Sequence, residues 1–533
     1  MTLVMAAPFA NYRAFRTASY EGDARLIIWT LAWDNHAVLT RASLFDSNVF
    51  YPAAQSLAYN EHLFGLSLFT LPIYAVTSNP VLAYNIAWLA SFLLNALAAH
   101  ALLRRFTGKD AAAAAGSLIF TFSFYKMLHA HGHLHLVWTW LIPVSVLCLE
   151  RWSERPTMSR AILWAGAVVL QSLTSWYLAV ITALIQAIAL VSHGPALRAR
   201  GQLRQLWHLA VVTTVSALIV WPFAKPYRVI EAASRREVAS NSTDLSGYLI
   251  PPENTWVGQL WLTHVGSGPR WIWGEQTVFL GWIAVLLAAA GAWRLTQLRQ
   301  WRLLLVSGLL VSAGVYLSMG PSLTRGVEGW SLFGALSSLP GLGGFRAPAR
   351  FALLVLLGLS LLGASGADWI LTRTRRGAMI VPLLLALMLS EWYVVKFPGG
   401  TPPPFSVPAI YRTGALATAR AVVSLPDYRG RTDWYRGSDY LYFSTAHWRP
   451  IVNGFGRSEP PEHARIISHM KAFPGPNNAR TMRSLGVDYV VFHADRQPAD
   501  AAAIIQEAQR VGEYELVARV GSDYLFRVLP QTR

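Results

Sequence analysis

The sequence predicts an all-α polytopic transmembrane bundle of ten or eleven spans, followed by a C-terminal α/β domain outside the membrane. Only 14% of the 533 residues are charged and 53% are hydrophobic, against roughly 25% charged in ordinary soluble domains. Largely uncharged runs of about 15 to 23 residues recur from Val81 to Val395, and most can cross a hydrocarbon layer ~30 Å thick. Beyond Phe397 the composition becomes that of a soluble domain. These observations exclude an ordinary cytosolic globular protein.

The charge pattern sets the direction of the spans. The joints after the first, third, fifth, seventh and ninth runs are short and rich in arginine, as is typical of cytoplasmic loops. The uncharged stretch 161–191 would be roughly 46 Å long as one helix, so we expect a tight hairpin near Thr174, Ser175 and Trp176. The predicted spans are about 81–103, 111–128, 134–149, 161–175, 177–191, 206–224, 277–293, 303–319, 351–371 and 378–395.

The excess of 45 basic over 28 acidic residues, a net charge of +17, follows largely from the same topology. In a soluble chain it would suggest nucleic acid, but here the arginines of the cytoplasmic joints explain much of it, and we expect no nucleic-acid partner. The sequence contains no P-loop, no dinucleotide fingerprint after a strand and no HExxH. Nucleotide-driven chemistry therefore has no support.

Two regions precede the soluble tail. Residues 1–62 are predicted to be a truncated first span, with Met1–Ala10 as its stub, and an outer loop with amphipathic helices. Residues 63–396 are predicted to be the transmembrane bundle. Its first segment, Leu63–Ser78, is short and interrupted by Pro72, which favours a helix in the outer interface, or a half-inserted one, over a spanning helix.

Residues 397–533 are predicted to form an α/β domain on the outer side, after the linker Gly399–Pro404. Runs rich in β-branched and aromatic residues predict strands, and an alanine-rich stretch predicts a helix. The expected strands are Arg420–Leu425, Tyr440–Phe443, Val487–His493, Tyr514–Val520 and Tyr524–Leu529, and the expected helix is Ala501–Val511.

Two acidic residues near the membrane are candidate general bases. Asp23 follows Gly22 at the start of the helix-like stretch Leu26–Leu39, and Glu61 stands at the start of the interfacial segment. A carboxylate just outside the bilayer can remove a proton from an acceptor hydroxyl. The plainer interpretation is a helix cap for Asp23 and a cap or interface anchor for Glu61. Asp34 lies ~16 Å further along a continuous helix, so it cannot pair closely with Asp23 unless that helix breaks.

Four alternating histidines, His129, His131, His133 and His135, lie between the second and third spans. In an extended segment the last three share one side, while a helix pairs His131 with His135, and either geometry could ligate a metal. One alternative is hydrogen bonding to a phosphate or sugar, which makes His131 and His133 candidate binding residues. Another is an interface role without chemistry. The sequence assigns no metal ligand, and a divalent cation is its one candidate cofactor.

The segment Gly341–Phe351 carries the sharpest signal. Arg346 and Arg350 stand four apart across Pro348, after a glycine-rich turn and at the outer end of a span. Pro348 suits the first turn of a helix, whose free N–H groups favour an anion. Arginine forks bind phosphate oxygens bidentately. Snorkelling to headgroups is the plainer alternative, but both residues lie on the side that the positive-inside rule leaves poor in arginine, which favours a phosphate site.

The outer loop 225–276 carries side chains suited to sugars. Tyr248–Asn254 and Trp271–Glu275 supply aromatic rings, an amide and carboxylates, which bind sugar faces and hydroxyls. Any single tryptophan there is equally explained by the membrane interface.

Several of these motifs resemble the GT-C superfamily of integral membrane glycosyltransferases, which use polyprenyl-phosphate-linked sugar donors. The tail resembles an uncharacterised bacterial branch of that superfamily. The motifs that carry the resemblance are Gly22-Asp23, the interfacial segment Asn60–Pro80, Pro251–Asn254, Phe345–Phe351, His447–Gly454 and Gly486–Val491.

The resemblance implies an inverting sugar transfer on the outer face of a bacterial inner membrane, within the cell envelope. It implies a polyprenyl-phosphate-linked sugar as donor, a glycan or lipid as acceptor, and contact with membrane lipids. It also places the base for the acceptor at Asp23. The charge pattern, for its part, places the C-terminal domain on the outer side, as a periplasmic or extracellular domain.

A transporter or flippase for lipid-linked or anionic substrates is the alternative function. Transporters place ionisable residues at mid-bilayer and show repeated halves. Here Lys126, Asp368 and Glu391 lie near span ends, and no repeat is evident, which favours the enzyme. A membrane-anchored scaffold is a third interpretation, but it would not need Arg346 and Arg350 at an outer helix start.

Overall fold

The computed structural model describes residues 5, 22–194, 202–230, 233–266, 274–320, 331–395, 406–431, 433–456 and 458–531. Three segments named above lie outside these ranges: Met1–Ala10 apart from Met5, Trp271–Trp273, and the linker Gly399–Pro404. The described chain divides into two compact units. We call them the bundle unit, with Leu63–Leu66 and the described part of Asn85–Thr401, and the sheet unit, with the described parts of Arg13–His62, Ser67–Tyr84 and Pro402–Arg533. Compactness alone does not test which segments fold independently, so the predicted boundaries after residues 62 and 396 stay predictions.

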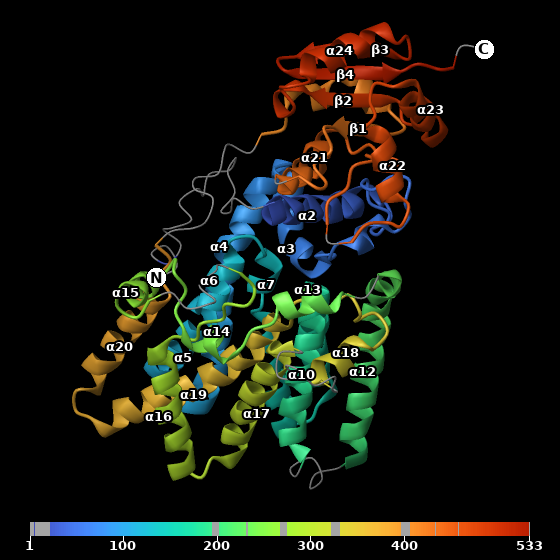
Figure 1. Ribbon diagram of the computed structural model, residues 1–533. Coiled ribbons are helices and arrows are strands. Elements are labelled where there is room, and N and C mark those ends of the chain that lie inside the picture. Colours follow the sequence, from blue (N-terminus) through green and yellow to red (C-terminus); the bar gives the residue numbers. More distant parts are fainter. Residues whose placement is uncertain are drawn as a thin grey trace. The chain divides into compact units, whose positions relative to one another are not determined.

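Apolar helices make up the bundle unit (Figure 1), and they coincide with the ten predicted spans. The predicted hairpin is confirmed, because one helix ends at Ser172 and the next begins at Trp176. The helices are α4 (Pro80–Thr107, from Asn85 in this unit), α5 (Asp110–Phe122), α6 (Phe124–Ala130), α7 (Leu134–Val137), α8 (Leu141–Glu154), α9 (Met158–Ser172), α10 (Trp176–Ser192), α12 (Gln202–Ala224), α16 (Trp282–Gln297), α17 (Trp301–Ser318), α19 (Ala352–Arg373) and α20 (Gly377–Glu391).

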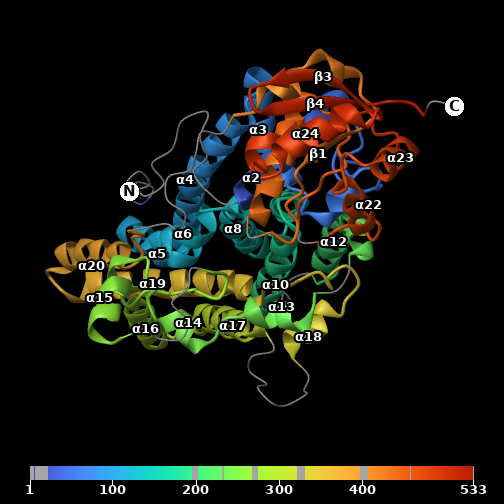
Figure 2. The ribbon, with the colours of Figure 1, turned by 45° about the horizontal axis from the view of Figure 1, so that its top comes forward.

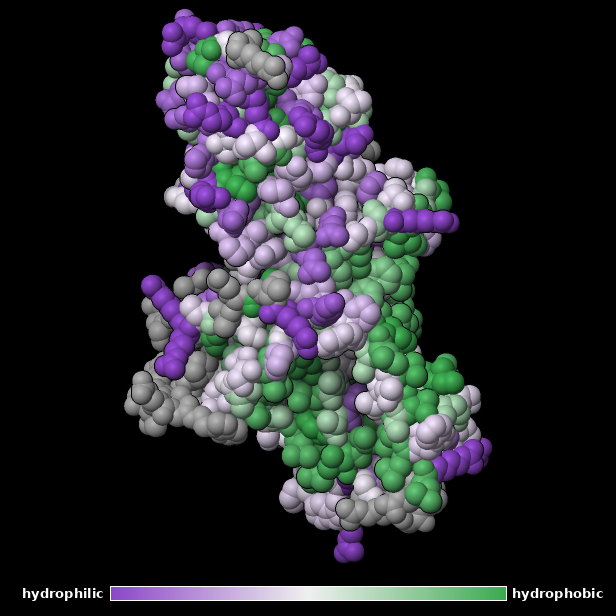
Figure 3. Space-filling view, turned by 90° about the vertical axis from the view of Figure 1, so that its right-hand side faces the viewer, coloured by the Kyte–Doolittle hydropathy of each residue, from purple (hydrophilic) through white to green (hydrophobic). Residues whose placement is uncertain are grey.

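These helices are those of a membrane protein. Within the described residues, five helices are long and apolar enough to cross a membrane, or six if α5 and α6 form one bent span. Figure 3 shows hydrophobic side chains gathered over the helices. Short elements join them: η3 (Lys225–Val229), α13 (Arg235–Ser240), α14 (Leu245–Leu249), α15 (Trp256–His264), α18 (Leu332–Ser337) and η5 (Pro348–Phe351).

The helix α19 lies at the centre of the bundle unit and fixes the position of the predicted arginine segment. In the most apolar stretch of Pro348–Arg373, 89% of the residues are buried inside the protein. In the corresponding stretch of Leu203–Arg228, only 11% are buried. α5, α16 and α17 pack against α19. The backbones of α16 and α19 come so close that a Cβ on Gly291 would lie 1.8 Å from the carbonyl oxygen of Leu362. The turn η5, which contains Arg350 and leads directly into α19, also packs against α17, so the arginine segment is held in place by this packing.

The histidine segment lies where two helices break. α6 is bent by 42° from α5. His131 follows the last residue of α6, and His133 precedes the first residue of α7. The backbone N–H of His133 donates to the carbonyl of His129 at 2.7 Å, so these two residues are one helical turn apart. The predicted pairing of His131 with His135 on a helix is not what the chain adopts.

A mixed four-stranded sheet forms the core of the sheet unit (Figures 1 and 2). Its order is β1 (Val422–Leu425), β2 (Tyr489–His493), β4 (Asp523–Val528) and β3 (Tyr514–Val520), and β1 and β2 are parallel while the other neighbours are antiparallel. The helices are α2 (Gly22–Thr40), α3 (Phe64–Thr77, from Ser67 in this unit), α21 (Gly437–Phe443), α22 (His463–Met470), α23 (Pro476–Leu485) and α24 (Ala501–Arg510), with short turns η2 (Ser56–Tyr59), η6 (Ala409–Arg412), η7 (Gly414–Thr418), η8 (Trp434–Arg436), η9 (Ser444–Ala446) and η10 (Ala494–Arg496).

The predicted fold class is confirmed, with one wrong element. Four expected strands and the expected helix at Ala501–Val511 are present within one or two residues. The strand expected at Tyr440–Phe443 is wrong, because these residues end the helix α21, which begins at Gly437 and packs against α2. All four side chains are buried, so packing on every side outweighs the preference of aromatic residues for strands.

The motif His447–Gly454 has a structural role in the sheet unit. The side chain of Asn453 accepts a hydrogen bond from the N–H of Ser424 at 2.7 Å and donates to its carbonyl at 2.8 Å, which caps β1 on one side. The N–H of Phe50 donates to the carbonyl of Asn453 at 3.0 Å, and the N–H of Ile451 donates to the carbonyl of Asn48 at 2.7 Å. This motif therefore ties the amino-terminal segment of the sheet unit to its sheet.

Candidate functional site

A buried ion pair joins the predicted arginine segment to the loop before α16 in the bundle unit. Arg350 Nη2 lies 2.7 Å from Glu275 Oε1, and Arg350 Nε lies 3.3 Å from both carboxylate oxygens. The two side chains are 6% and 17% exposed. An ion pair this deeply buried is stable only with such close geometry, because both charges have lost their hydration.

Neighbouring elements hold both partners in place. The carbonyl of Gln276, next to Glu275, accepts a hydrogen bond from the Thr243 hydroxyl at 2.7 Å. The guanidinium carbon of Arg350 lies 4.5 Å from the centre of the Tyr177 ring. Burial raises the pKa of Glu275, but the charge of Arg350, with smaller contributions from nearby histidines, outweighs it and holds that pKa well below its usual range. Glu275 is therefore an anion at neutral pH.

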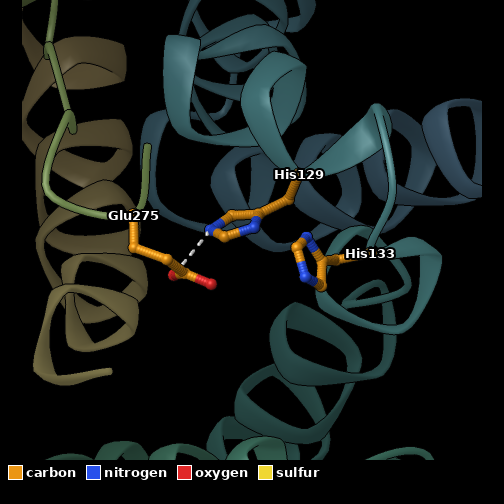
Figure 4. A group of neighbouring side chains, drawn as sticks. All are labelled: His129, His133 and Glu275. Carbon is orange, nitrogen blue, oxygen red and sulfur yellow. Dashed lines mark ion pairs between the residues drawn. The ribbon is translucent and has the colours of Figure 1, made fainter. Parts of the chain in front are cut away.

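Two histidines complete the group around Glu275, and we call His129, His133 and Glu275 the bundle cluster (Figure 4). One nitrogen of each imidazole and one carboxylate oxygen all lie within 4.8 Å of one another. His129 Nε2 is 3.8 Å from Glu275 Oε2. His129 is buried, and neither of its ring nitrogens has a hydrogen-bond partner among the described residues. These three side chains are residues that could hold a metal ion.

Arg346 lies in a different environment from Arg350. Its side chain is 38% exposed, and Nη1 lies 3.2 Å from Oε1 of Glu237, which is 28% exposed. The hydroxyl of Tyr177 accepts hydrogen bonds from the N–H groups of Arg346 and Ala347 at 2.7 and 3.2 Å. As predicted, Pro348 opens the helical turn η5 directly before α19. The sequence did not predict that each arginine has a carboxylate partner.

The remaining predicted residues lie apart along the chain. His131 is buried at the end of α6, and His133 is partly buried at the start of α7. Asp23 stands in the first turn of α2, and Glu61 is partly buried between η2 and α3; both belong to the sheet unit. Because α2 is continuous from Gly22 to Thr40, Asp34 is ~16 Å from Asp23 along it, as expected.

Sequence reasoning named His129 and Glu275 only as members of longer motifs, without selecting them as site residues, and it did not name Tyr177 or Glu237. A signal existed for the first two residues, since His129 stands four positions before His133 and Glu275 ends an aromatic outer loop just before a predicted span. Tyr177 lies inside an apolar run and Glu237 lies in a short polar helix, so no sequence pattern marked either one.

A second histidine–carboxylate group lies in the sheet unit, and we call His493, Asp495 and Asp523 the sheet cluster. His493 Nδ1 lies 2.6 Å from Asp523 Oδ1, and Nε2 lies 2.9 Å from the hydroxyl of Tyr411. Tyr411 in turn lies 2.7 Å from the hydroxyl of Ser424. Both ring nitrogens of His493 are therefore used in hydrogen bonds.

The sheet unit also has a cavity of about 460 Å³ at the carboxyl ends of β1 and β2. Its polar lining includes Asp427, Arg431, Lys471 and Arg496. Ligands of open α/β sheets often bind at this edge.

The chain is similar to one protein family and to several solved structures. Residues 32–392 match the family model described as Domain of unknown function (DUF6311). No curated protein matches the sequence. The cryo-EM structure of the arabinofuranosyltransferase AftD from Mycobacteria is similar, with a TM-score of 0.57 and 15% identity over 99% of this chain. This likeness confirms the GT-C fold. The chain spans only 40% of the length of that protein.

Two further solved structures are similar at lower scores. ArnT from Cupriavidus metallidurans, bound to undecaprenyl phosphate, has a TM-score of 0.49 and 13% identity, over 99% of this chain and 98% of that one. The archaeal oligosaccharyltransferase AglB from Archaeoglobus fulgidus has a TM-score of 0.44 and 13% identity, over 98% of this chain and 73% of that one.

Proposed function

The chain belongs to the DUF6311 family, and we propose that it is a membrane glycosyltransferase that moves a sugar from a polyprenyl-phosphate donor to a glycan or lipid acceptor. We place the transfer on the outer face of a bacterial inner membrane, because the charge pattern predicts which loops face outward and the resemblance of the motifs implies a bacterial membrane. One observation carries the proposal: a partly exposed arginine stands at the start of the central apolar helix of a GT-C fold.

Arg346 is the proposed ligand of the donor phosphate. Its guanidinium is accessible, and its ion pair with Glu237 is partly exposed, so a phosphate can replace the carboxylate at small cost. Arg350 is the more deeply buried of the two and is bound by Glu275, so we assign it the role of orienting that carboxylate. His131 and His133 remain proposed contacts of the phosphate or sugar.

Asp23 is the proposed base for the acceptor hydroxyl, with Glu61 as the second candidate. A base must be ionised and must reach the proton that it removes. Asp23 meets the first condition at the amino-terminal end of α2, where the helix dipole favours a negative charge. The cavity beside β1 and β2 is a proposed site for part of the acceptor, since its charged lining suits a polar glycan.

Replacing Asp23 tests this function directly. In proteoliposomes with a radiolabelled polyprenyl-phosphate sugar, we expect Asp23→Asn to lower transfer at least 100-fold, the usual contribution of general acid–base catalysis. Glu462→Gln, which removes a carboxylate that is 76% exposed, is the control and should keep full transfer. Wild-type transfer by Asp23→Asn would remove this residue from the mechanism. A wild-type protein without transfer, but with facilitated movement of the lipid across the bilayer, would favour the flippase.

A further inference from the structure

We propose that the bundle cluster is a site for one divalent transition-metal ion, with Zn²⁺ as the best match to its ligands. The ligands are imidazole nitrogens of His129 and His133 and a carboxylate oxygen of Glu275. The proposal concerns binding alone, so it does not depend on the reaction that the protein catalyses.

The spacing of the three donor atoms suits a small metal ion. Ligands of tetrahedral zinc at about 2.0–2.1 Å lie about 3.3 Å from one another. His129 Nε2 and Glu275 Oε2 are 3.8 Å apart, and all three donor atoms lie within 4.8 Å. Small side-chain rotations therefore close the site. In Figure 4 the three side chains point toward one another from α6, the turn after it and the loop before α16.

The state of His129 is a second, independent observation. Its side chain is 2% exposed, and both ring nitrogens lack hydrogen-bond partners among the described residues. Burying an imidazole without a partner costs free energy, and such groups in native proteins usually have a ligand or water. A metal ion at Nε2 supplies that partner.

Arg350 holds the carboxylate of Glu275 in position. It donates to Oε1 of Glu275 at 2.7 Å and more weakly to Oε2 at 3.3 Å, and Oε2 is the oxygen that lies 3.8 Å from His129 Nε2. Carboxylates and imidazoles that ligate metals are commonly oriented by such outer partners. Two imidazoles with one carboxylate favour zinc or a similar transition metal over Mg²⁺ or Ca²⁺, which prefer oxygen ligands. Three protein ligands leave a fourth position open for water or an anionic oxygen.

The sheet cluster has the same residue types but does not carry the same inference. His493 already donates and accepts through both nitrogens, toward Asp523 and Tyr411, and Asp495 is exposed. A metal there would have to displace two short hydrogen bonds.

Metal binding to the whole protein tests the proposal. The untagged full-length chain in detergent is treated with a chelator, loaded with ZnCl₂ and passed through a desalting column before elemental analysis. We expect about one Zn²⁺ per chain and, with Co²⁺ as a probe, the visible absorption of a tetrahedral site. His133→Asn should weaken binding at least tenfold, the loss typical even for an outer-shell partner.

Two further variants keep the outcome decisive. His129→Gln tests the second imidazole, and thermal unfolding of each variant shows whether it is folded. His264→Asn alters an exposed histidine of the bundle unit at the end of α15, outside the cluster, and should keep wild-type Zn²⁺ binding. A wild-type protein that retains no Zn²⁺, or folded His133→Asn and His129→Gln variants that bind as tightly as wild type, would overturn the proposal. Transfer activity is not read in this experiment, so a failed glycosyltransferase assay leaves the result intact.

Discussion

The bundle cluster and the sheet cluster each bring histidines close to carboxylates, but the histidine nitrogens are hydrogen-bonded in only one of them, as far as the described residues show. In the sheet cluster, His493 bonds to Asp523 at 2.6 Å and to Tyr411 at 2.9 Å, so its imidazole is part of a closed hydrogen-bond chain. In the bundle cluster, His129 has no hydrogen-bond partner among the described residues, and Glu275 is bound to Arg350 instead. Proximity of histidines and carboxylates therefore does not define a site; the unused bonding capacity of each group does.

The largest effect is expected at Glu275, because its partner is a buried charge. Glu275→Gln leaves the Arg350 guanidinium, 6% exposed, beside a neutral amide, and the loss of one partner of a buried ion pair costs about 3–5 kcal/mol. Chemical unfolding followed by tryptophan fluorescence measures the change. Glu515→Gln, in an ion pair about half exposed, should change stability by less than ~1 kcal/mol. Equal stabilities of these two variants would mean that the Glu275–Arg350 pair is not a buried charge pair.

The two histidines are expected to respond differently to the same substitution. His493→Leu removes two hydrogen bonds and leaves Asp523 without its partner, which we expect to cost about 2–4 kcal/mol. In metal-free protein His129→Leu removes no hydrogen bond to the part of the chain that the structure describes, so we expect a change in stability within ~1 kcal/mol. The unfolding midpoints of both variants after chelator treatment check this. If His129→Leu were as unstable as His493→Leu, the bonding difference between the clusters would be wrong.

An effect that appears only at acid pH is expected at His447, which stacks on Tyr411 near the sheet cluster. Burial, with a smaller contribution from Arg449, lowers the pKa of His447 to about 4, and its Nδ1 accepts a hydrogen bond from the Arg449 N–H. The unfolded chain takes up this proton near pH 6.5 and the folded chain does not, so stability falls as the pH drops from about 6.5 to about 4.

His447→Gln tests that dependence, because glutamine keeps a polar side chain and cannot titrate. Unfolding midpoints at pH 7.5 and pH 5 should differ less in this variant than in wild type. The same pH dependence in both proteins would assign the acid sensitivity to other groups.

Much of the fold could be predicted because it depends on local pattern. Uncharged runs predicted the main apolar helices among the described residues of the bundle unit, including the turn between α9 and α10, although α5–α6 and α7–α8 each divide one predicted span. Pro348 marked the turn before α19, since proline suits a first helical turn. Tyr440–Phe443 was misassigned because its burial comes from segments distant in sequence, among them α2 and His493 of β2, which no local pattern reveals.

The candidate site could be predicted only in part. Arg346, Arg350, His131 and His133 were selected because arginine and histidine in short motifs have recognisable chemistry, and their roles stay predictions. The partners could not be selected, because Glu275 and Glu237 are distant in sequence from the arginines that they bind.

The sequence by itself determined that this is a helical membrane protein with a small α/β region, because hydrophobicity and charge act at every residue regardless of its neighbours in space. Only the tertiary structure decided that Arg350 is bound by Glu275 while Arg346 stays accessible, and that His129 rather than His131 faces that carboxylate. Hydrogen bonds and ion pairs act over a few ångströms, so they depend on which distant segments the folded chain brings together.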